Sequence, residues 1–304
     1  MENKVLLSLC IPTNGIKEWV YAVLESIYNQ GADNEKFEVV VTDNGNNQEF
    51  YDWITEYARL HDNLRYFKTQ SYMFLNEIDC YKKANGVFIK FLNHRTMMLP
   101  GALGKIIDFV EVNQSSKPSV YFSNGVLKFN GVKVLKDFDS YVRELSYWSS
   151  WSTGMAFWKE DFDKFVNNIS YNTLFPHTDI LFHEKNKETY IVNNEVLLKE
   201  LPTKGVAKGK YDLFYAFAIE YLSIIQALMQ DNYVTISTFL KIKNDNLSFL
   251  AGLYVDYFLL KRKCSYDLSS FKSAVKVYYS VGKVKRRVFW VFNRRAFVKI
   301  FKRR

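Results

Sequence analysis

The chain has 304 residues, 48% of them hydrophobic and 17% aromatic, which argues against a chain that is disordered throughout and suits one core domain with an extension. Residues 283–304 hold ten Lys or Arg and no Asp or Glu, so they account for the whole formal net charge of +9 and the rest of the chain is nearly neutral. This uneven distribution argues against a nucleic-acid binder with cations spread over its folded surface.

The first hundred residues alternate between short apolar runs and segments with helical periodicity. The apolar runs predict strands over 5–11, 37–41, 64–67 and 87–92, with helices between them that end near residues 31, 60 and 84. Strands this apolar, separated by helices, predict a parallel sheet covered on both faces. Because ligands of such sheets bind beyond the carboxyl ends of the strands, we expect the loops after Ile11, Val41 and Leu92 to converge on one pocket.

The pattern after residue 100 is more varied. A helix to about residue 112 and a strand over 119–122 are followed by Asn130-Gly131 between apolar runs, which predicts a β-hairpin over 126–135. The aromatic-rich segment 147–158 looks like a strand, and the periods from 210 to 280 are helical. The apolar stretch 213–229 contains Glu220 and indicates a buried helix rather than a membrane span, and the short apolar run near the start indicates a first strand rather than a signal peptide.

Two features limit the chemistry. Cys10, Cys80 and Cys264 are far apart and suit neither a metal site nor a disulfide framework, which favours a reducing compartment. The first strand is followed by Pro-Thr-Asn-Gly and not by Gly-x-Gly-x-x-Gly, which argues against an oxidoreductase that uses a dinucleotide.

Five segments, in chain order, resemble the family 2 glycosyltransferases, an inverting group with the GT-A fold. They are LSLCIPTNGIKEWVYAVLESIYNQ, FEVVVTDNGN, ANGVFIKFLNHRTMMLPGAL, WSTGMAFWKEDF and FPHTDILF, and the resemblance extends from about Val5 to Leu198. It implies an α/β GT-A-like domain over 1–205, with a mostly parallel sheet flanked by helices. A helical region over 206–282 and a basic-aromatic tail over 283–304 would follow.

Asp43 ends the second predicted strand, where the resemblance places a carboxylate that binds the nucleotide base or ribose. Such a carboxylate can accept hydrogen bonds from a uracil N–H or from ribose hydroxyls. The alternative is a turn aspartate that bonds backbone N–H groups of Asp-Asn-Gly. Pro12 and Thr13 follow the first strand and are expected to line the same nucleotide pocket.

Asn93, His94 and Arg95 stand where the family usually carries Asp-x-Asp, which holds Mg²⁺ or Mn²⁺ against the diphosphate. Arg cannot ligate a cation, and Asn or His alone is a poor ligand for a hard metal, so the metal requirement is open. Arg95 and His94 could contact the pyrophosphate in place of a metal. A metal could instead be carried mostly by the diphosphate, or the chain could have lost activity and only bind sugar nucleotide or partner enzymes.

Asp179 is the candidate general base, which would remove the proton of the acceptor hydroxyl as the donor bond breaks. The alternative is an aspartate in the first turn of a helix, and Glu160 and Asp161 are weaker candidates for the base. Trp151, from an aromatic cluster with Trp148 and Trp158, is expected on the acceptor side together with His177. Core packing for the tryptophans and a capping role for the histidine are the alternatives.

The tail over 283–304 mixes aromatic clusters with cations, a composition that suits an anionic membrane surface, with partner docking or nucleic acid as alternatives. No nucleic-acid motif accompanies it. We therefore expect a cytoplasmic glycosyltransferase, peripheral at the inner face of the cell membrane. It would move a sugar from a nucleotide donor to a glycan or polyprenyl-linked acceptor in bacterial surface-polysaccharide (capsule) assembly. UDP is the expected nucleotide, with dTDP and GDP as alternatives. The alternative is a non-catalytic sugar-nucleotide or glycan-binding partner of another glycosyltransferase.

Overall fold

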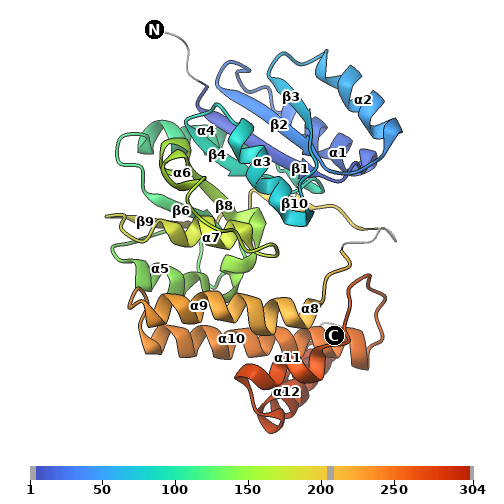
Figure 1. Cartoon of the computed structure of the whole chain (residues 1–304), viewed down its shortest axis with the longest axis vertical. Helices are drawn as coiled ribbons and strands as arrows, with labels where there is room; N and C mark the ends of the chain where they lie inside the picture. Colours follow the sequence, from blue (N-terminus) through green and yellow to red (C-terminus); the bar gives the residue numbers. More distant parts are fainter. Residues whose placement is uncertain (1–4, 204–208, 302–304) are drawn as a thin grey trace. The chain divides into compact units, whose positions relative to one another are not determined.

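The computed structural model describes residues 5–203 and 209–301, with side chains described through residue 297 (Figure 1). The chain forms two compact units. Unit 1 comprises Met1–Tyr141 and Trp148–Pro202, and unit 2 comprises Val142–Tyr147 and Thr203–Arg304. All three cysteines are free, as the spacing predicted.

Unit 1 is built on an eight-stranded sheet with the strand order β3-β2-β1-β4-β8-β6-β9-β7. The strands are β1 Leu7–Thr13, β2 Phe37–Asp43, β3 Leu64–Lys68, β4 Phe88–Phe91, β6 Ser119–Phe122, β7 Val132–Leu135, β8 Met155–Trp158 and β9 Tyr190–Asn193. β1 runs parallel to β2 and β4, and β2 runs parallel to β3. β8 runs antiparallel to β4 and β6, β9 runs parallel to β6, and β7 runs antiparallel to β9. β5 Thr96–Met98 and β10 Leu198–Glu200 form a separate antiparallel pair.

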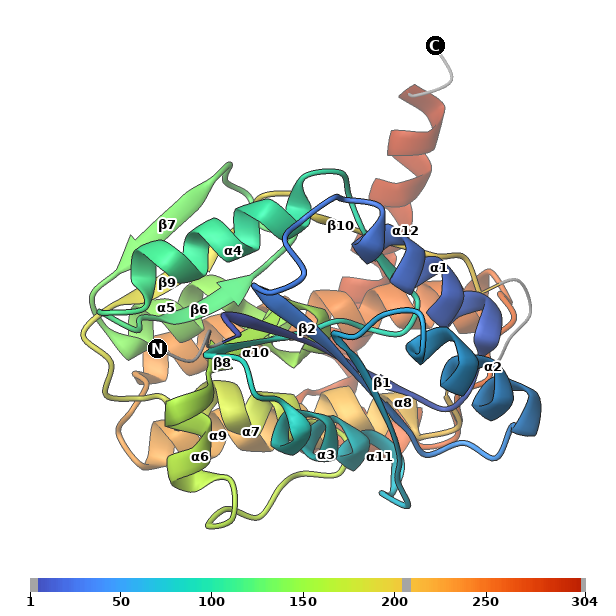
Figure 2. The same ribbon diagram turned by 90° about the horizontal axis from the view of Figure 1, so that it is seen from above.

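Helices cover both faces of this sheet (Figure 2). The helices of unit 1 are α1 Lys17–Tyr28, α2 Gln48–Ala58, α3 Asn76–Lys83, α4 Ala102–Asn113, α5 Phe138–Leu145, which continues into unit 2, α6 Lys159–Phe165 and α7 Pro176–His183. Alternate residues of a strand point to opposite faces, so each buried strand contributes to two layers. Leu9 of β1 packs in the core beneath α1, α2 and α4, whereas the next residue, Cys10, bonds the carbonyl of Cys80 in α3. The α/β GT-A-like architecture with a mostly parallel sheet is therefore confirmed.

The sequence prediction was wrong for the hairpin over 126–135. Only Val132–Leu135 forms a strand there, and it pairs with β9. Asn194 takes the place of the missing partner strand, since its side-chain amide bonds both the N–H and the C=O of Leu127, at 3.2 and 3.1 Å. A side chain from a distant segment thus satisfies the backbone that a hairpin would have paired.

The aromatic segment 147–158 is also less regular than predicted. It contains two 3₁₀ turns, η2 Ser146–Ser150 and η3 Ser152–Gly154, and only Met155–Trp158 is a strand. Tyr121 from β6 lies directly against the turn, and a Cβ on Gly154 would come within 2.1 Å of its ring. The Tyr121 hydroxyl donates a hydrogen bond to the carbonyl of Trp151 at 2.7 Å. Glycine is therefore required at 154 because the ring occupies the space of a side chain.

Unit 2 is helical. Its elements are α8 Leu213–Tyr215, the π-helical turn η4 Ala216–Glu220, α9 Tyr221–Gln230, α10 Ile236–Tyr254, the π-helical turn η5 Val255–Leu259, α11 Phe271–Tyr278 and α12 Val281–Phe301. Within the described residues, the continuous helix Leu213–Gln230 has the length and apolar composition of a membrane span, a criterion that the core helix of a soluble protein also meets, and 44% of it is buried inside the protein. Residues 283–301 of the predicted tail form most of α12, which packs against α10 through Val291 and Ala251.

Candidate active site at the carboxyl ends of the strands

The ends of β1 and β2 are fixed side by side by a buried asparagine. Thr13 pairs with Asp43 in the parallel register. Asn76, at the start of α3, donates hydrogen bonds from its side chain to the carbonyl of Thr13 at 3.2 Å and to that of Thr42 at 3.0 Å. These bonds attach the start of α3 to the last residues of both strands. Pro12 lies one residue earlier in β1, opposite Thr42.

The Asp43 carboxylate is fully buried and has three hydrogen-bond donors. The backbone N–H of Gly45 donates at 2.7 Å, the Tyr66 hydroxyl at 3.1 Å and the Lys68 ammonium at 2.9 Å. Burial, together with the adjacent Asp43 carboxylate, raises the pKa of Tyr66. The turn interaction considered as the alternative for Asp43 is therefore present. A nucleotide can reach this carboxylate only if a neighbour moves, and Lys68, with 42% of its side chain exposed, is the most accessible of them.

The loop between β4 and β5 contacts the end of β1 through His94. Its Nδ1 lies 2.8 Å from the Thr13 hydroxyl oxygen, and its ring lies edge-on to Trp19 of α1 with 5.1 Å between centroids. Burial, and to a lesser degree the neighbouring Arg95, lowers the pKa of His94 to about 4, so the ring is neutral at neutral pH. The Thr13 oxygen already accepts the N–H of Gly15 at 3.1 Å. The Thr13 hydroxyl can donate its own proton to Nδ1, and in that arrangement the ring proton of His94 lies on Nε2.

Arg95 is bound to the strand β10. Its guanidinium forms an ion pair with Glu200 at 3.0 Å and donates to the carbonyl of Leu201 at 3.2 Å, and 17% of its side chain is exposed. Asn93 accepts the backbone N–H of Arg95 with its side-chain oxygen at 3.2 Å. In this structure, therefore, neither Arg95 nor His94 is the free cation that a direct replacement of the metal would use.

The metal that the family resemblance implies has poor ligands at this loop. Mg²⁺ and Mn²⁺ favour carboxylate oxygens, and the loop supplies none. The Nδ1 atom of His94 bonds Thr13, and the Asn93 oxygen bonds Arg95. Over residues 5–203 and 209–301, no group of three or more His, Cys, Asp or Glu is arranged to hold a metal ion. These residues do not fit a hard cation held by the protein alone.

The predicted acceptor side is organised by the N-terminal turn of α7. His177 is buried, with Nε2 at 2.9 Å from the carbonyl of Ser150 and Nδ1 at 3.4 Å from a Glu77 carboxylate oxygen. Burial alone would lower the pKa of His177, but the Glu77 carboxylate and the Ser150 carbonyl outweigh it, and the pKa is raised. Asp179, two residues further on, is partly exposed and accepts the backbone N–H of Asn172 at 2.6 Å.

The start of α3 links the two parts of the site. Asn76 holds the strand ends, and the next residue, Glu77, faces His177 in α7. Neither residue was predicted from the sequence. The available signal was the polar pair Asn-Glu at the start of a helix, which does not distinguish a buried pair from an ordinary helix start.

Lys90 was also missed. It lies in β4, three residues before Asn93, and its side chain is fully buried. Its ammonium group donates to the carbonyls of Phe91, Thr153 and Met155 at 2.9, 2.6 and 3.2 Å, and burial lowers its pKa to about 7. It thereby ties the start of the β4–β5 loop to the turn before β8. A lysine inside the apolar run Val-Phe-Ile-Lys-Phe-Leu was the signal for it.

The aromatic cluster divides between core and surface. Trp158 is buried and donates its ring N–H to the carbonyl of Pro118 at 2.8 Å, so it belongs to the core. Trp148 and Trp151 are partly exposed, with ring centroids 5.6 Å apart. The acceptor-side role of Trp151 remains a prediction.

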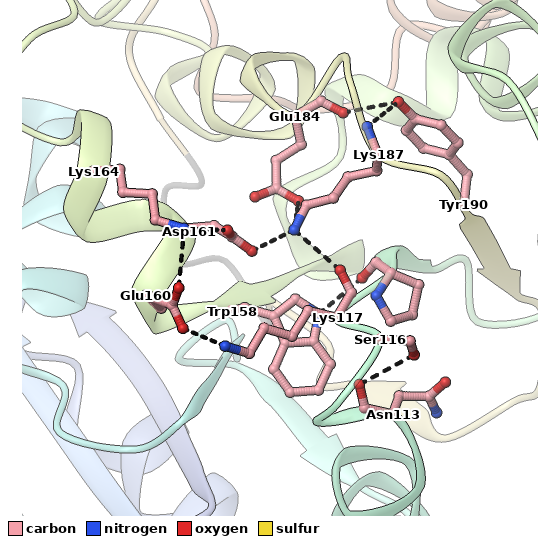
Figure 3. A network of polar contacts seen from close by, with 11 residues as sticks. Asn113, Ser116, Lys117, Trp158, Glu160, Asp161, Lys164, Glu184, Lys187 and Tyr190 are labelled. Carbon is pink, nitrogen blue, oxygen red and sulfur yellow. Dashed lines mark hydrogen bonds and ion pairs between the residues drawn. The ribbon is translucent and has the colours of Figure 1, made fainter.

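The two weaker candidates for the base lie in an ion-pair network (Figure 3). Glu160 contacts Lys117 and Lys164, and Asp161 contacts Lys187. Both carboxylates of α6 are therefore held in ion pairs, which indicates a structural role. Asp179 is thus the partly exposed carboxylate that remains from the sequence prediction.

Comparison with known proteins identifies the family. The model of glycosyl transferase family 2 matches residues 8–173, which is more than half of the chain. No curated protein matches. TarS 1-349 from S. aureus has a TM-score of 0.59 and 15% identity, and the match covers 95% of this chain and 89% of that one. The same fragment in complex with UDP-GlcNAc matches with a TM-score of 0.58 and 16% identity, over 93% of this chain and 82% of that one.

A longer structure of S. aureus TarS matches with a TM-score of 0.54 and 15% identity. That match covers 84% of this chain and only 44% of the longer protein, so the chain spans less than half of it. Similarity at these identities shows the fold. Because the family model covers more than half of the chain, the chain belongs to glycosyl transferase family 2, a family of inverting enzymes that use nucleotide-sugar donors.

Proposed function

We propose that the chain transfers a sugar from a UDP-linked donor to a hydroxyl group of a glycan or lipid-linked acceptor, in bacterial surface-polysaccharide assembly. The observation that carries the proposal is the meeting of three loops at one edge of the sheet. Thr13 pairs with Asp43 in the register and bonds His94 across the end of β1. Ligands of open α/β sheets bind at this edge. TarS 1-349, which shares the fold, has been crystallised with UDP and with UDP-GlcNAc.

On the donor side, Asp43 accepts a hydrogen bond from the uracil or ribose once Lys68 moves aside. The diphosphate that leaves the sugar gains negative charge and needs hydrogen-bond donors aimed at it. His94 supplies one. Its ring is neutral, and when Nδ1 accepts the Thr13 proton the ring proton lies on Nε2, which has no hydrogen-bond partner among the described residues. This assigns to a neutral imidazole a contact that the family usually gives to a metal.

On the acceptor side, Asp179 takes the proton of the attacking hydroxyl while the bond between the sugar carbon and the diphosphate oxygen breaks. The hydroxyl oxygen forms the new bond from the opposite face, which inverts the configuration. The carboxylate is partly exposed, and its helix is held by the contacts of His177 with Glu77 and Ser150. An exposed base on a fixed helix suits an acceptor that approaches from solvent.

The donor part is tested by thermal shift with UDP-, GDP- and dTDP-sugars, each with Mn²⁺ and with EDTA. We expect a UDP-sugar to raise the melting temperature and Asp43→Ala to abolish the rise. Asp52→Ala is the matched control, because Asp52 is exposed and, among the residues that the structure describes, bonds only Gln48. The absence of a shift with every sugar nucleotide would contradict the proposal.

Catalysis is tested separately from binding, because the missing acidic residues at 93–95 favour one other function. A non-catalytic partner of another glycosyltransferase would bind the UDP-sugar and neither transfer nor hydrolyse it. We expect the wild type to hydrolyse the donor slowly. Asp179→Asn should reduce the rate of this hydrolysis and leave the thermal shift with the UDP-sugar unchanged. Binding without hydrolysis or transfer to any acceptor would establish the non-catalytic function.

We also propose that the segment 283–304 holds the protein at an anionic membrane surface on the cytoplasmic side. Within the described part of α12, Phe289, Trp290 and Phe297 are 73, 51 and 63% exposed among several cations. Exposed aromatic residues beside cations suit the boundary between headgroups and hydrocarbon. The protein should co-sediment with phosphatidylglycerol vesicles and not with phosphatidylcholine vesicles. Equal co-sedimentation with both would refute the proposed attachment to an anionic surface.

A further inference from the structure

Unit 2 contains an apolar groove that none of the chemistry above uses. It is lined mainly by residues of α11 and α12, together with Tyr254 at the end of α10 and Leu259 of η5, and has a volume of about 540 Å³. Its floor includes Val275 and Val284, which are 3 and 4% exposed, and Val288. A volume of this size is typical of a site for one small ligand.

The mouth of the groove keeps large apolar side chains in contact with water. Phe289 is 73% exposed, Leu259 46% and Phe292 41%. A contiguous apolar surface of this kind marks a binding site more often than a free surface, because covering it releases water. The groove therefore fits a ligand with a hydrocarbon portion.

The polar part of the lining has a single sign of charge. Lys272, Lys276 and Lys285 line the groove, and no Asp or Glu of the described part of the chain does. Lys272 and Lys276 are one turn apart on α11, and Lys285 stands across from them on α12. Among the described residues, none of the three forms an ion pair. Three unpaired ammonium groups around an apolar floor complement a phosphate group attached to a hydrocarbon chain.

We propose that this groove binds one lipid molecule that carries a single hydrocarbon chain on a phosphate head, with the chain on the valine floor and the phosphate between the three lysines. The site goes beyond the proposed transfer reaction, since it lies in unit 2 and needs neither donor nor acceptor hydroxyl. It also differs from general adhesion to an anionic surface, because it requires both a chain of suitable length and a negative head.

The test uses soluble single-chain amphiphiles below their micelle concentrations. Binding of octyl, decyl and dodecyl phosphate is measured by calorimetry, together with decyl maltoside and decyltrimethylammonium. We expect affinity for the phosphates to rise by up to roughly fourfold per added methylene until the groove is filled. At equal chain length, we expect the affinity to be highest for the phosphate, lower for the maltoside and lowest for the ammonium compound.

Two variants separate the two parts of the site. K272E/K276E should weaken decyl phosphate binding at least tenfold and leave decyl maltoside binding unchanged. Val288→Trp, which fills the groove, should weaken both. K136E/K199E is the control, because it changes the net charge equally at two exposed positions of unit 1 and should have no effect. Circular dichroism and the melting temperature confirm that each variant is folded.

Equal affinity for the three head groups, or phosphate binding that survives K272E/K276E, would overturn the proposal. So would an acidic amphipathic peptide that binds the groove when no alkyl phosphate does, since the occupant would then be a protein helix. The UDP-sugar thermal shift is run on the same variants. If alkyl phosphates do not bind but the UDP-sugar still raises the melting temperature, only the lipid site is refuted. If the UDP-sugar gives no shift, the transferase proposal fails.

Discussion

The buried pair of Glu77 and His177 gives the sharpest test of how the acceptor side is held. The Glu77 and His177 side chains are 4 and 5% exposed, and His177 Nδ1 lies 3.4 Å from the Glu77 oxygen. Glu77→Gln removes the charge and keeps the shape. Because the carboxylate is what raises the pKa of His177 against the effect of burial, the variant should reverse the direction of that shift.

The sign of the pH dependence follows from this reversal. In the wild type the pKa of His177 is raised above its unfolded value. Its contribution to stability is therefore fully present below about pH 6.5 and is lost as the pH rises through the folded value. In Glu77→Gln, burial lowers the pKa instead, so protonation at acid pH destabilises the folded state. The stability difference between the two proteins should be about 3–5 kcal/mol at acid pH, the usual effect of breaking a buried ion pair.

The difference should then decrease with rising pH, by at most about 1.4 kcal/mol per pH unit. Urea unfolding from pH 5.5 to 8.5 measures it. Five of the six tryptophans lie in unit 1, so their fluorescence in a Trp290→Phe background follows that unit. In a His177→Gln background, the part of the pH dependence that comes from the titration of His177 should be absent. A difference that stays constant with pH while His177 is present would refute the reasoning.

Three further predictions concern the strand ends. Asp43→Asn should abolish UDP binding in titration calorimetry and lower the free energy of unfolding by about 1–3 kcal/mol, because Gly45 N–H and Tyr66 O–H lose a charged acceptor. His94→Ala should weaken binding of the UDP-sugar by about tenfold, and His94→Gln by less, since the amide still donates a hydrogen bond. Because the pKa of His94 is about 4, its titration should not change the affinity of the wild type between pH 5.5 and 8. In the wild type, burial lowers the pKa of folded Lys90 to about 7, so between pH 7 and 10 the unfolded state binds more protons and the free energy of unfolding rises with pH. Lys90→Met should reduce this rise, which urea unfolding at several pH values measures.

Much of unit 1 could be predicted from local patterns. The runs at 5–11, 37–41 and 87–92 are apolar on both faces of the strand, which only a sheet covered on two sides can bury. Their loops had to meet at one edge, and Thr13, Asp43 and His94 do meet there. The hairpin over 126–135 failed because a turn signal cannot reveal that Asn194, more than sixty residues away, satisfies the backbone of Leu127.

The state of the predicted site residues could not be derived from the sequence in the same way. Arg95 seemed to be a free cation, but Glu200 neutralises it from β10. His94 seemed to be a possible cation, but burial beside Trp19 keeps it neutral. Both outcomes depend on desolvation and on partners that lie far away in the chain.

The α/β layers, the edge where the loops converge and the family could be predicted from sequence patterns, because hydrophobic periodicity and strand-end residues are local properties. Which of those residues are charged, and which are held by others, depends on the tertiary structure. It placed Glu77 against His177, 100 residues apart, and gathered Lys272, Lys276 and Lys285 around one groove. Charge state and ligand fit depend on burial and on neighbours, and a linear pattern does not contain either.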